Sequence, residues 1–175
     1  MAIRDGKVAA DDTVDGRPHL PPGAAMQLPG RGTTFVRTMH GPQHAPTVLL
    51  LHGWTASADL NWYTCYRPLS RHYRVVAIDH RGHGRGIRSK KAFSLEDCAD
   101  DAMAVCDVLG IDRVIPVGYS MGGPIAQLIW QRHRERVRGM VSALAERGLR
   151  VIAVANAEHG DGPLPEHQTG FAFSF

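Results

Sequence analysis

The segment Val114-Ile-Pro-Val-Gly-Tyr-Ser-Met-Gly-Gly123 decides the expected fold, because an apolar strand, a sharp turn and the start of a helix follow one another in it. Its centre, Gly118 to Gly122, has the spacing G-x-S-x-G. The probability that a chain of this composition contains this spacing by chance is roughly 8%. Small residues at positions 118 and 122 allow the tight turn and leave the Ser120 hydroxyl exposed above the sheet. The alternative is a serine that only caps a helix.

Apolar runs and helical periodicity alternate along the rest of the chain. Expected strands cover Thr33–Met39, Thr47–Leu51, Tyr73–Ile78, Val114–Val117 and Leu149–Ala155. Expected helices cover Ala58–Ser70, Leu95–Leu109 and Met121–Val137, the second with Ser94 at its start and Gly110 as its stop. This alternation predicts an α/β fold with a doubly wound, mostly parallel sheet. We assign residues 1–24 to a disordered polar tail, 25–160 to the folded domain and 161–175 to a C-terminal tail.

Composition excludes several classes of protein. The chain has 175 residues, a net charge of +3 and no dense basic stripe, so we expect neither nucleic acid nor membrane as a partner. Its longest apolar run, Thr47–Leu51, is far shorter than a membrane span, and residues 1–15 do not resemble a signal peptide. We therefore expect a cytoplasmic location. Three cysteines without a C-x-x-C pair indicate reduced, buried thiols and no cysteine zinc site.

Two further motifs follow the earlier strands. His52-Gly-Trp54 comes directly after the Thr47 strand, and Asp79-His-Arg-Gly-His-Gly84 comes directly after the Tyr73 strand. With the Ser120 segment, these motifs make residues 31–140 resemble the α/β-hydrolase superfamily in its serine esterase and lipase-like branch. The resemblance implies that Ser120 is the nucleophile and that the amides of Trp54 and Met121 form the oxyanion hole.

The same resemblance implies lesser roles for neighbouring residues. Asp79 and Arg81 would mainly hold a loop, whereas His52, Gly53 and Tyr119 would contact substrate. Related enzymes that open epoxides or remove halides have aspartate at the position of Ser120, so the serine argues against those reactions. Pro116 departs from the family pattern, because it removes one hydrogen-bond donor from a central strand.

The family's catalytic histidine and acid follow the nucleophile in the chain. His159, on a glycine-containing loop after the Leu149 strand, is the preferred base, with an exposed loop histidine as the alternative. His133 lies on a basic helix face, and His167 lies in the tail. Glu146 at a helix end, Glu158 and Asp161 are poor candidates for the acid, which we leave unassigned. Only 55 residues follow Ser120, so we expect a shortened fold without a lid.

These residues together predict a serine hydrolase that acts on a small ester-like or similar acyl substrate, with no metal or organic cofactor. Two alternatives stay open: a catalytically inactive α/β-hydrolase fragment, and a ligand-binding module that uses the same pocket. We also hypothesise that shortening exposes a sheet edge near the Leu149 strand, through which two copies form a homodimer.

Overall fold

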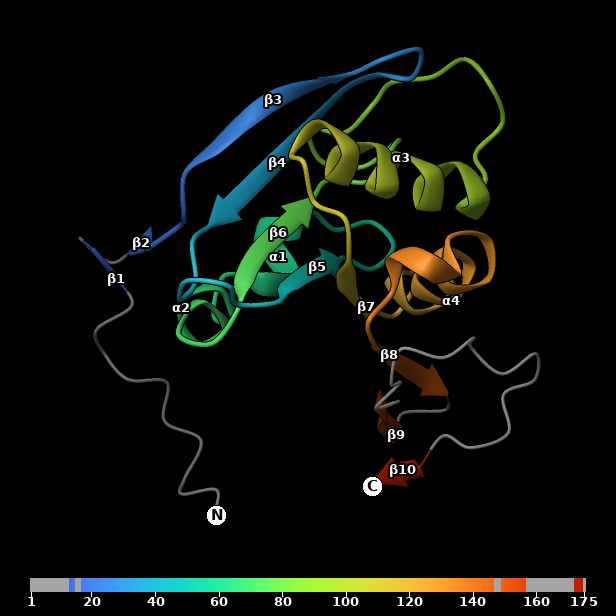
Figure 1. The fold of residues 1–175 in the computed structure, drawn as a ribbon. Helices are drawn as coiled ribbons and strands as arrows, with labels where there is room; N and C mark the ends of the chain where they lie inside the picture. Colours follow the sequence, from blue (N-terminus) through green and yellow to red (C-terminus); the bar gives the residue numbers. More distant parts are fainter. Residues whose placement is uncertain (1–12, 15–16, 147–148, 157–171, 175) are drawn as a thin grey trace.

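Parallel strands form the centre of the sheet in the computed structural model, which describes residues 13–14, 17–146, 149–156 and 172–174, with side chains for residues 19–140. The central strands are β5 (Thr47–Leu51), β6 (Arg74–Ile78), β7 (Val114–Tyr119) and β8 (Met140–Glu146), adjacent in the order β8-β7-β5-β6. Each pair in this series is parallel, and Figure 1 shows helices between them along the chain. The predicted α/β fold is therefore confirmed.

Antiparallel strands extend both edges of the parallel centre. One edge carries a hairpin of β3 (Gly23–Leu28) and β4 (Gly32–Met39), and the other carries β9 (Leu149–Asn156) and β10 (Ala172–Ser174). β3 begins inside the region assigned to the N-terminal tail, and β10 belongs to the region assigned to the C-terminal tail. β10 pairs with residues 154–156 of β9, at the edge of the sheet where we expect an exposed edge. A separate small ladder joins β1 (Thr13–Val14) and β2 (Arg17–Pro18).

The helices match the expected positions, but their lengths differ. The segment expected as one helix over residues 58–70 divides into α1 (Ala58–Trp62) and α2 (Tyr66–Ser70), and the next helix is α3 (Leu95–Val108). The last helix, α4 (Gly122–Arg132), ends earlier than expected and a 3₁₀ turn, Arg134–Arg136, follows it. No helix among these is long and apolar enough to cross a membrane.

The ends of α3 follow the expected capping pattern. The Ser94 hydroxyl accepts a hydrogen bond from the Asp97 amide at 3.0 Å, which satisfies one free amide of the first helical turn. Gly110, just past the helix, has φ +62°, a conformation in which glycine is not strained. Sequence signals therefore predicted both ends of this helix correctly.

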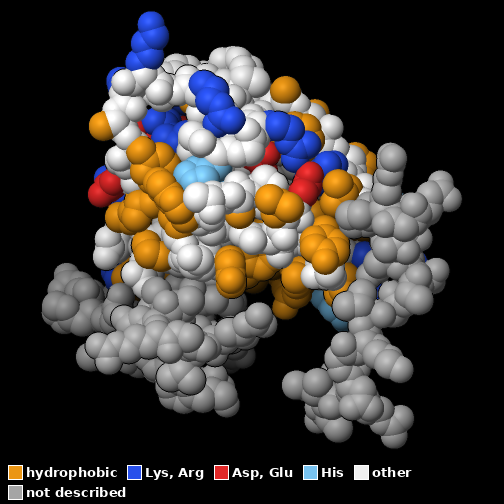
Figure 2. All heavy atoms as spheres, turned by 180° about the vertical axis from the view of Figure 1, so that it is seen from behind, with side chains coloured by type: hydrophobic (Ala, Val, Ile, Leu, Met, Phe, Trp, Pro, Cys, Tyr) orange, Lys and Arg blue, Asp and Glu red, His pale blue; other side chains and the backbone are white. Residues whose placement is uncertain are grey.

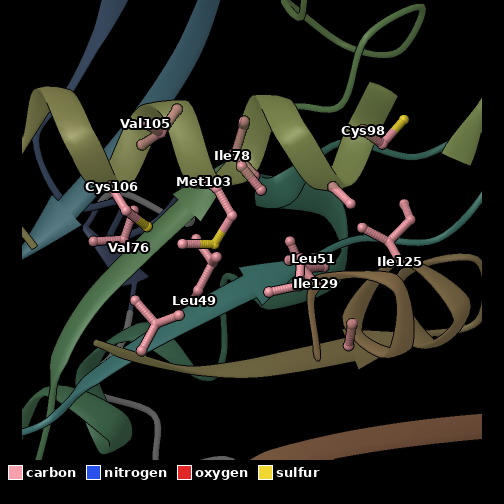
Figure 3. Packing of buried hydrophobic residues seen from close by; sticks show 14 of the residues in the cluster. Leu49, Leu51, Val76, Ile78, Cys98, Met103, Val105, Cys106, Ile125 and Ile129 are labelled. Atoms are coloured by element: carbon pink, nitrogen blue, oxygen red, sulfur yellow. The ribbon is translucent and has the colours of Figure 1, made fainter. Parts of the chain in front are cut away.

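Alternating side chains of the parallel strands pack against helices on opposite faces of the sheet. Leu49 and Leu51 of β5 belong to the cluster formed with α3 and α4, as the close view in Figure 3 shows. Val48 and Leu50 belong to the cluster that contains Ala58 of α1 and Tyr66 of α2. The continuous apolar run of β5 is thus explained by burial on both faces.

Pro116 is accommodated between two points of pairing. β8 pairs with β7 from Val117 onward, and before the proline an isolated parallel bridge joins Val114 to Val137. The missing amide donor therefore falls in a gap of the ladder, and the strand prediction around Pro116 is confirmed.

Candidate active site

Ser120 lies at the turn between β7 and α4, at the carboxyl end of the parallel strands. Its φ is +52°, in the left-handed region that a non-glycine residue rarely adopts. The residue is half-buried, so the turn leaves it partly exposed at the carboxyl end of the central strands. The strained turn expected from the G-x-S-x-G spacing is therefore observed.

The two glycines of the motif are required by close backbone contacts. A Cβ atom on Gly118 would lie 2.1 Å from the Gly122 carbonyl oxygen, and one on Gly122 would lie 2.1 Å from the Leu51 carbonyl oxygen. Both separations are far below any real carbon–oxygen contact. The turn at Ser120 can therefore form only with the smallest residue at these two positions.

The loop after β5 lies directly against this turn. A Cβ atom on Gly53 would lie 3.1 Å from the Ser120 Cβ and 3.3 Å from Tyr119 Cδ1. The Gly53 amide donates a hydrogen bond of 2.8 Å to Asn61 Oδ1 of α1. Asn61 thus fixes the loop that borders the candidate nucleophile. No sequence motif indicated Asn61, because its contact depends on how α1 folds back onto β5.

The amides assigned to the oxyanion hole occupy the two sides of this junction. Trp54 follows Gly53 on the loop, and Met121 follows Ser120 at the start of α4. Within residues 19–140, neither amide donates to a backbone carbonyl or to a side chain. The two amides therefore have no hydrogen-bond partner within residues 19–140.

His52 is buried below the surface of the candidate site, so its side chain cannot contact a substrate. Its side chain is fully buried, and its Nε2 accepts a hydrogen bond of 2.9 Å from the His80 amide. The other ring nitrogen, Nδ1, therefore carries the proton and donates to the Gly53 carbonyl oxygen at 2.7 Å. Burial lowers the pKa of His52. This corrects the expectation for His52, which holds two strand-end loops together instead.

Two more histidines pack beside it. The ring centroids of His52 and His80 are 4.4 Å apart, and those of His52 and His83 are 5.6 Å apart. His80 is fully buried, and neither of its ring nitrogens has a hydrogen-bond partner in the described part of the chain. Burial, followed by the two neighbouring histidines, lowers the pKa of His80 well below 6.5. The rings of His52 and His80 are therefore neutral packing groups at neutral pH.

Asp79 connects the loop after β6 to α1. Its buried carboxylate accepts hydrogen bonds from the Ala58 amide at 2.8 Å and from the Arg85 amide at 2.9 Å. The hydroxyl of Thr34 in β4 donates to the Asp79 carbonyl oxygen at 2.7 Å. Asp79 thus holds together three segments that surround the candidate site, which matches the loop-holding role implied by the resemblance.

Arg81 anchors the same loop to α3. Its guanidinium donates two hydrogen bonds, of 2.7 and 2.8 Å, to the carboxylate of Asp101 and a third, of 2.8 Å, to Asp97. Arg31, from the turn between β3 and β4, also pairs with Asp101. Asp101 is only 1% exposed, and the two guanidinium groups compensate the negative charge of its buried carboxylate.

The base and acid of the proposed triad have no counterpart in the described part of the chain. His159 and His167, together with Glu158 and Asp161, lie outside the described residues. His133 is described, but its Nε2 pairs with Asp100 of α3 at 3.1 Å, away from Ser120 along α4. Glu146 ends strand β8 and not a helix, because pairing with β7 and β9 outweighs its helix-forming neighbours.

Within the described residues, no group of three or more His, Cys, Asp or Glu side chains could hold a metal ion.

Comparison with known proteins relates this geometry to a large family. The model of the alpha/beta hydrolase fold matches residues 46–170. Epoxide hydrolase B of Mycobacterium tuberculosis is 32% identical over 140 residues, which are 75% of this chain and 38% of that protein. A bifunctional esterase/perhydrolase of Acinetobacter calcoaceticus is 39% identical over 84 residues, 47% of this chain and 30% of that protein.

Solved structures give the same relationship. A serine hydrolase from Cycloclasticus zankles superposes with a TM-score of 0.64 at 26% identity, over 70% of this chain and 44% of that one. The chain thus spans less than half the length of these relatives. The matched region contains both the loop after β5 and the turn at Ser120. The chain belongs to the α/β-hydrolase fold family.

Proposed function

We propose that this chain hydrolyses an ester or a similar acyl bond, with Ser120 as the nucleophile. The observation that carries the proposal is the left-handed backbone of Ser120, held between Gly118 and Gly122 at the end of a parallel strand. Such strain persists only where the surrounding structure imposes it, and it is typical of functional positions. A serine that merely capped α4 would not need it.

The reaction would proceed through an acyl-enzyme. Ser120 Oγ attacks the substrate carbonyl carbon and its proton passes to the base, for which His159 is the candidate. The amides of Trp54 and Met121 stabilise the tetrahedral oxyanion. The base then protonates the leaving alcohol as the carbon–oxygen bond breaks, and water hydrolyses the acyl-enzyme by the same steps.

The relatives differ in chemistry, so residue 120 is used to choose among them. Their names include an epoxide hydrolase, an esterase/perhydrolase and a non-heme chloroperoxidase. A serine hydroxyl adds to a carbonyl carbon, the substrate's alcohol leaves, and the serine is held as an ester that water can then hydrolyse. This favours acyl transfer over epoxide opening for this chain.

A second candidate is a ligand-binding domain without turnover. It is supported by His133, the single histidine after Ser120 in the described part of the chain, because this residue pairs with Asp100 instead of Ser120. In that case the loop after β5 and the turn at Ser120 would bind a small ester or acid without cleaving it. Catalytic action therefore depends on His159.

Covalent labelling separates the two candidates. A fluorophosphonate should modify wild-type protein, and mass spectrometry of the peptides should place the adduct on Ser120. Ser120→Ala should abolish the label, whereas Ser70→Ala, which removes a hydroxyl bonded only to the nearby Arg67 carbonyl oxygen, should not change it. Absence of labelling in correctly folded wild type would refute the hydrolase proposal and favour the binding domain.

A further inference from the structure

An exposed aromatic surface adjoins the candidate active site. Trp54 is 57% exposed, Tyr119 is 45% exposed and Phe93 is 39% exposed. Trp54 follows Gly53 and Tyr119 precedes Ser120, and a Cβ atom on Gly53 would lie 3.1 Å from the Ser120 Cβ. We refer to Trp54, Phe93 and Tyr119 as the aromatic surface. Large side chains exposed together beside a site usually bind an apolar partner.

Ring contacts keep part of this surface in place. The Trp54 ring packs edge-on against Phe93 at 5.2 Å and against His83 at 4.8 Å, measured between centroids. Phe93 and His83 are also in edge contact, at 5.6 Å. Such a mutually packed trio has little freedom to rearrange, so its exposed side is a preformed apolar wall.

Positive charge borders this wall. The segment that leads into Phe93 carries Arg88, Lys90 and Lys91, all exposed. The Arg88 guanidinium donates to the Gly84 carbonyl oxygen at 2.5 Å, which fixes this cation one residue from His83. Figure 2 shows lysine and arginine side chains gathered next to hydrophobic ones on one face of the molecule.

Acidic groups near this segment do not cancel its charge. Asp97 is paired with Arg81 through a hydrogen bond of 2.8 Å, and Asp101 is buried between Arg81 and Arg31. Glu96 is exposed at the start of α3 and is a single charge against three cations. The three exposed cations of this segment therefore outnumber its one unpaired acidic group.

We propose that this surface binds an anionic amphiphile: a molecule whose hydrocarbon chain lies on Trp54 and Phe93 and whose carboxylate or phosphate lies against Arg88, Lys90 and Lys91. The proposal deepens the proposed function, on which it rests, by naming the class of substrate as acyl compounds with an anionic group. The ligand is the free small molecule, because the wall consists of only three packed side chains, Trp54, His83 and Phe93.

Binding to the Ser120→Ala variant tests this without any turnover. Isothermal titration with sodium decanoate, below its micelle concentration, is compared with decyltrimethylammonium and decanol. Decanoate should bind about tenfold more tightly than the cationic probe, and its affinity should fall as sodium chloride rises from 50 to 300 mM, since exposed charges are screened. Equal affinity for the three head groups would overturn the proposal.

Charge variants locate the anion. Lys90→Glu with Lys91→Glu should weaken decanoate binding about fivefold or more. Arg71→Glu with Arg138→Glu makes the same change of net charge at exposed positions that precede β6 and β8, at the amino ends of the strands, and should leave binding within about twofold. An equal loss in both pairs would show a general charge effect and refute the site.

Apolar variants locate the hydrocarbon chain. Trp54→Ala should weaken decanoate binding more than butyrate binding, whereas Val108→Ala, at an exposed position at the far end of α3, should affect neither. Binding to phosphatidylglycerol vesicles without binding of free decanoate would overturn the proposal in favour of a membrane surface. Decanoate binding without fluorophosphonate labelling would retain this surface and refute only the hydrolase function.

Discussion

The carbonyl oxygen of Gly122 lies 2.1 Å from the position that a Cβ atom on Gly118 would occupy. The glycine before the candidate nucleophile is therefore in contact with the first turn of the helix that follows it. Any side chain at position 118 must push β7 and α4 apart, and Ser120 lies between them.

Gly118→Ala should consequently abolish fluorophosphonate labelling and lower the free energy of unfolding by about 1 to 3 kcal/mol, the usual cost of overpacking. Urea denaturation measures the second effect. Gly110→Ala is the matched control: its φ is +62° but no atom lies within 4 Å of the added carbon, so it should be destabilised by strain and keep its label. Normal labelling of Gly118→Ala would show that the turn is not tightly constrained.

Removing the buried carboxylate of Asp101 should destabilise the fold. Asp101→Asn leaves the guanidinium of Arg81 without its two-bond partner and weakens the Arg31 contact, which we expect to cost about 3 kcal/mol. Asp100→Asn, on the same helix, weakens partly exposed pairs with Arg132 and His133 and should have a much smaller effect. Equal unfolding midpoints for the two variants in urea would contradict this assignment.

Two buried histidines, His52 and His80, should make the free energy of unfolding fall in mild acid. Their folded-state pKa values lie below the ordinary value of 6.5, so below that pH the unfolded chain binds protons that the folded chain does not. The contribution of these histidines to the free energy of unfolding is then fully present above pH 6.5. It decreases as the pH falls, by up to about 1.4 kcal/mol per pH unit for each histidine.

Denaturation between pH 5 and 7.5 tests this, because the carboxylates with lowered pKa values titrate below that range. His80→Leu removes both unpartnered ring nitrogens and should make the slope shallower. His72→Leu, which changes an exposed ring, should keep the wild-type slope. An unchanged slope in His80→Leu would mean that His80 does not contribute to the pH dependence.

The three histidines after Ser120 should differ in their effect on labelling. A general base contributes about 10² to 10⁴ in rate, so His159→Ala should slow labelling at least about tenfold. His133→Ala should slow it little, because His133 pairs with Asp100, and His167→Ala should have no effect. The rate of fluorophosphonate adduct formation is the measurement. Equal rates for wild type and His159→Ala would exclude His159 as the base.

Local sequence predicted those elements whose burial or ends are indicated by neighbouring residues in the chain. The continuous apolar run Thr47–Leu51 indicated a strand buried on both faces, and Ser94 and Gly110 indicated the ends of α3. β3 was missed because its residues Gly23–Leu28 are mostly exposed at the sheet edge and have little β-propensity. β8 was missed because Ala, Leu and Glu favour a helix until pairing with two strands overrides them.

The candidate site was predicted in part for a related reason. The strained turn at Ser120 follows from a local motif, so the spacing of that motif, with an apolar strand before it and a helix after it, indicated the turn. The inward orientation of His52 depends on His80 in the loop after β6, and the Gly53 contact depends on Asn61 of α1; no local pattern includes these partners.

The order of strands around β5 has a consequence for synthesis of the chain. β5 pairs with β6 on one side and with β7 on the other, and β7 begins only at Val114. At about 5 to 20 residues per second, the ribosome needs several seconds after Leu51 to deliver that second partner. During this interval β5, with its four apolar residues after Thr47, has an open edge of the kind that pairs with other chains. The yield of folded protein should therefore depend on whether the open edge of β5 is protected from other chains until β7 has been synthesised.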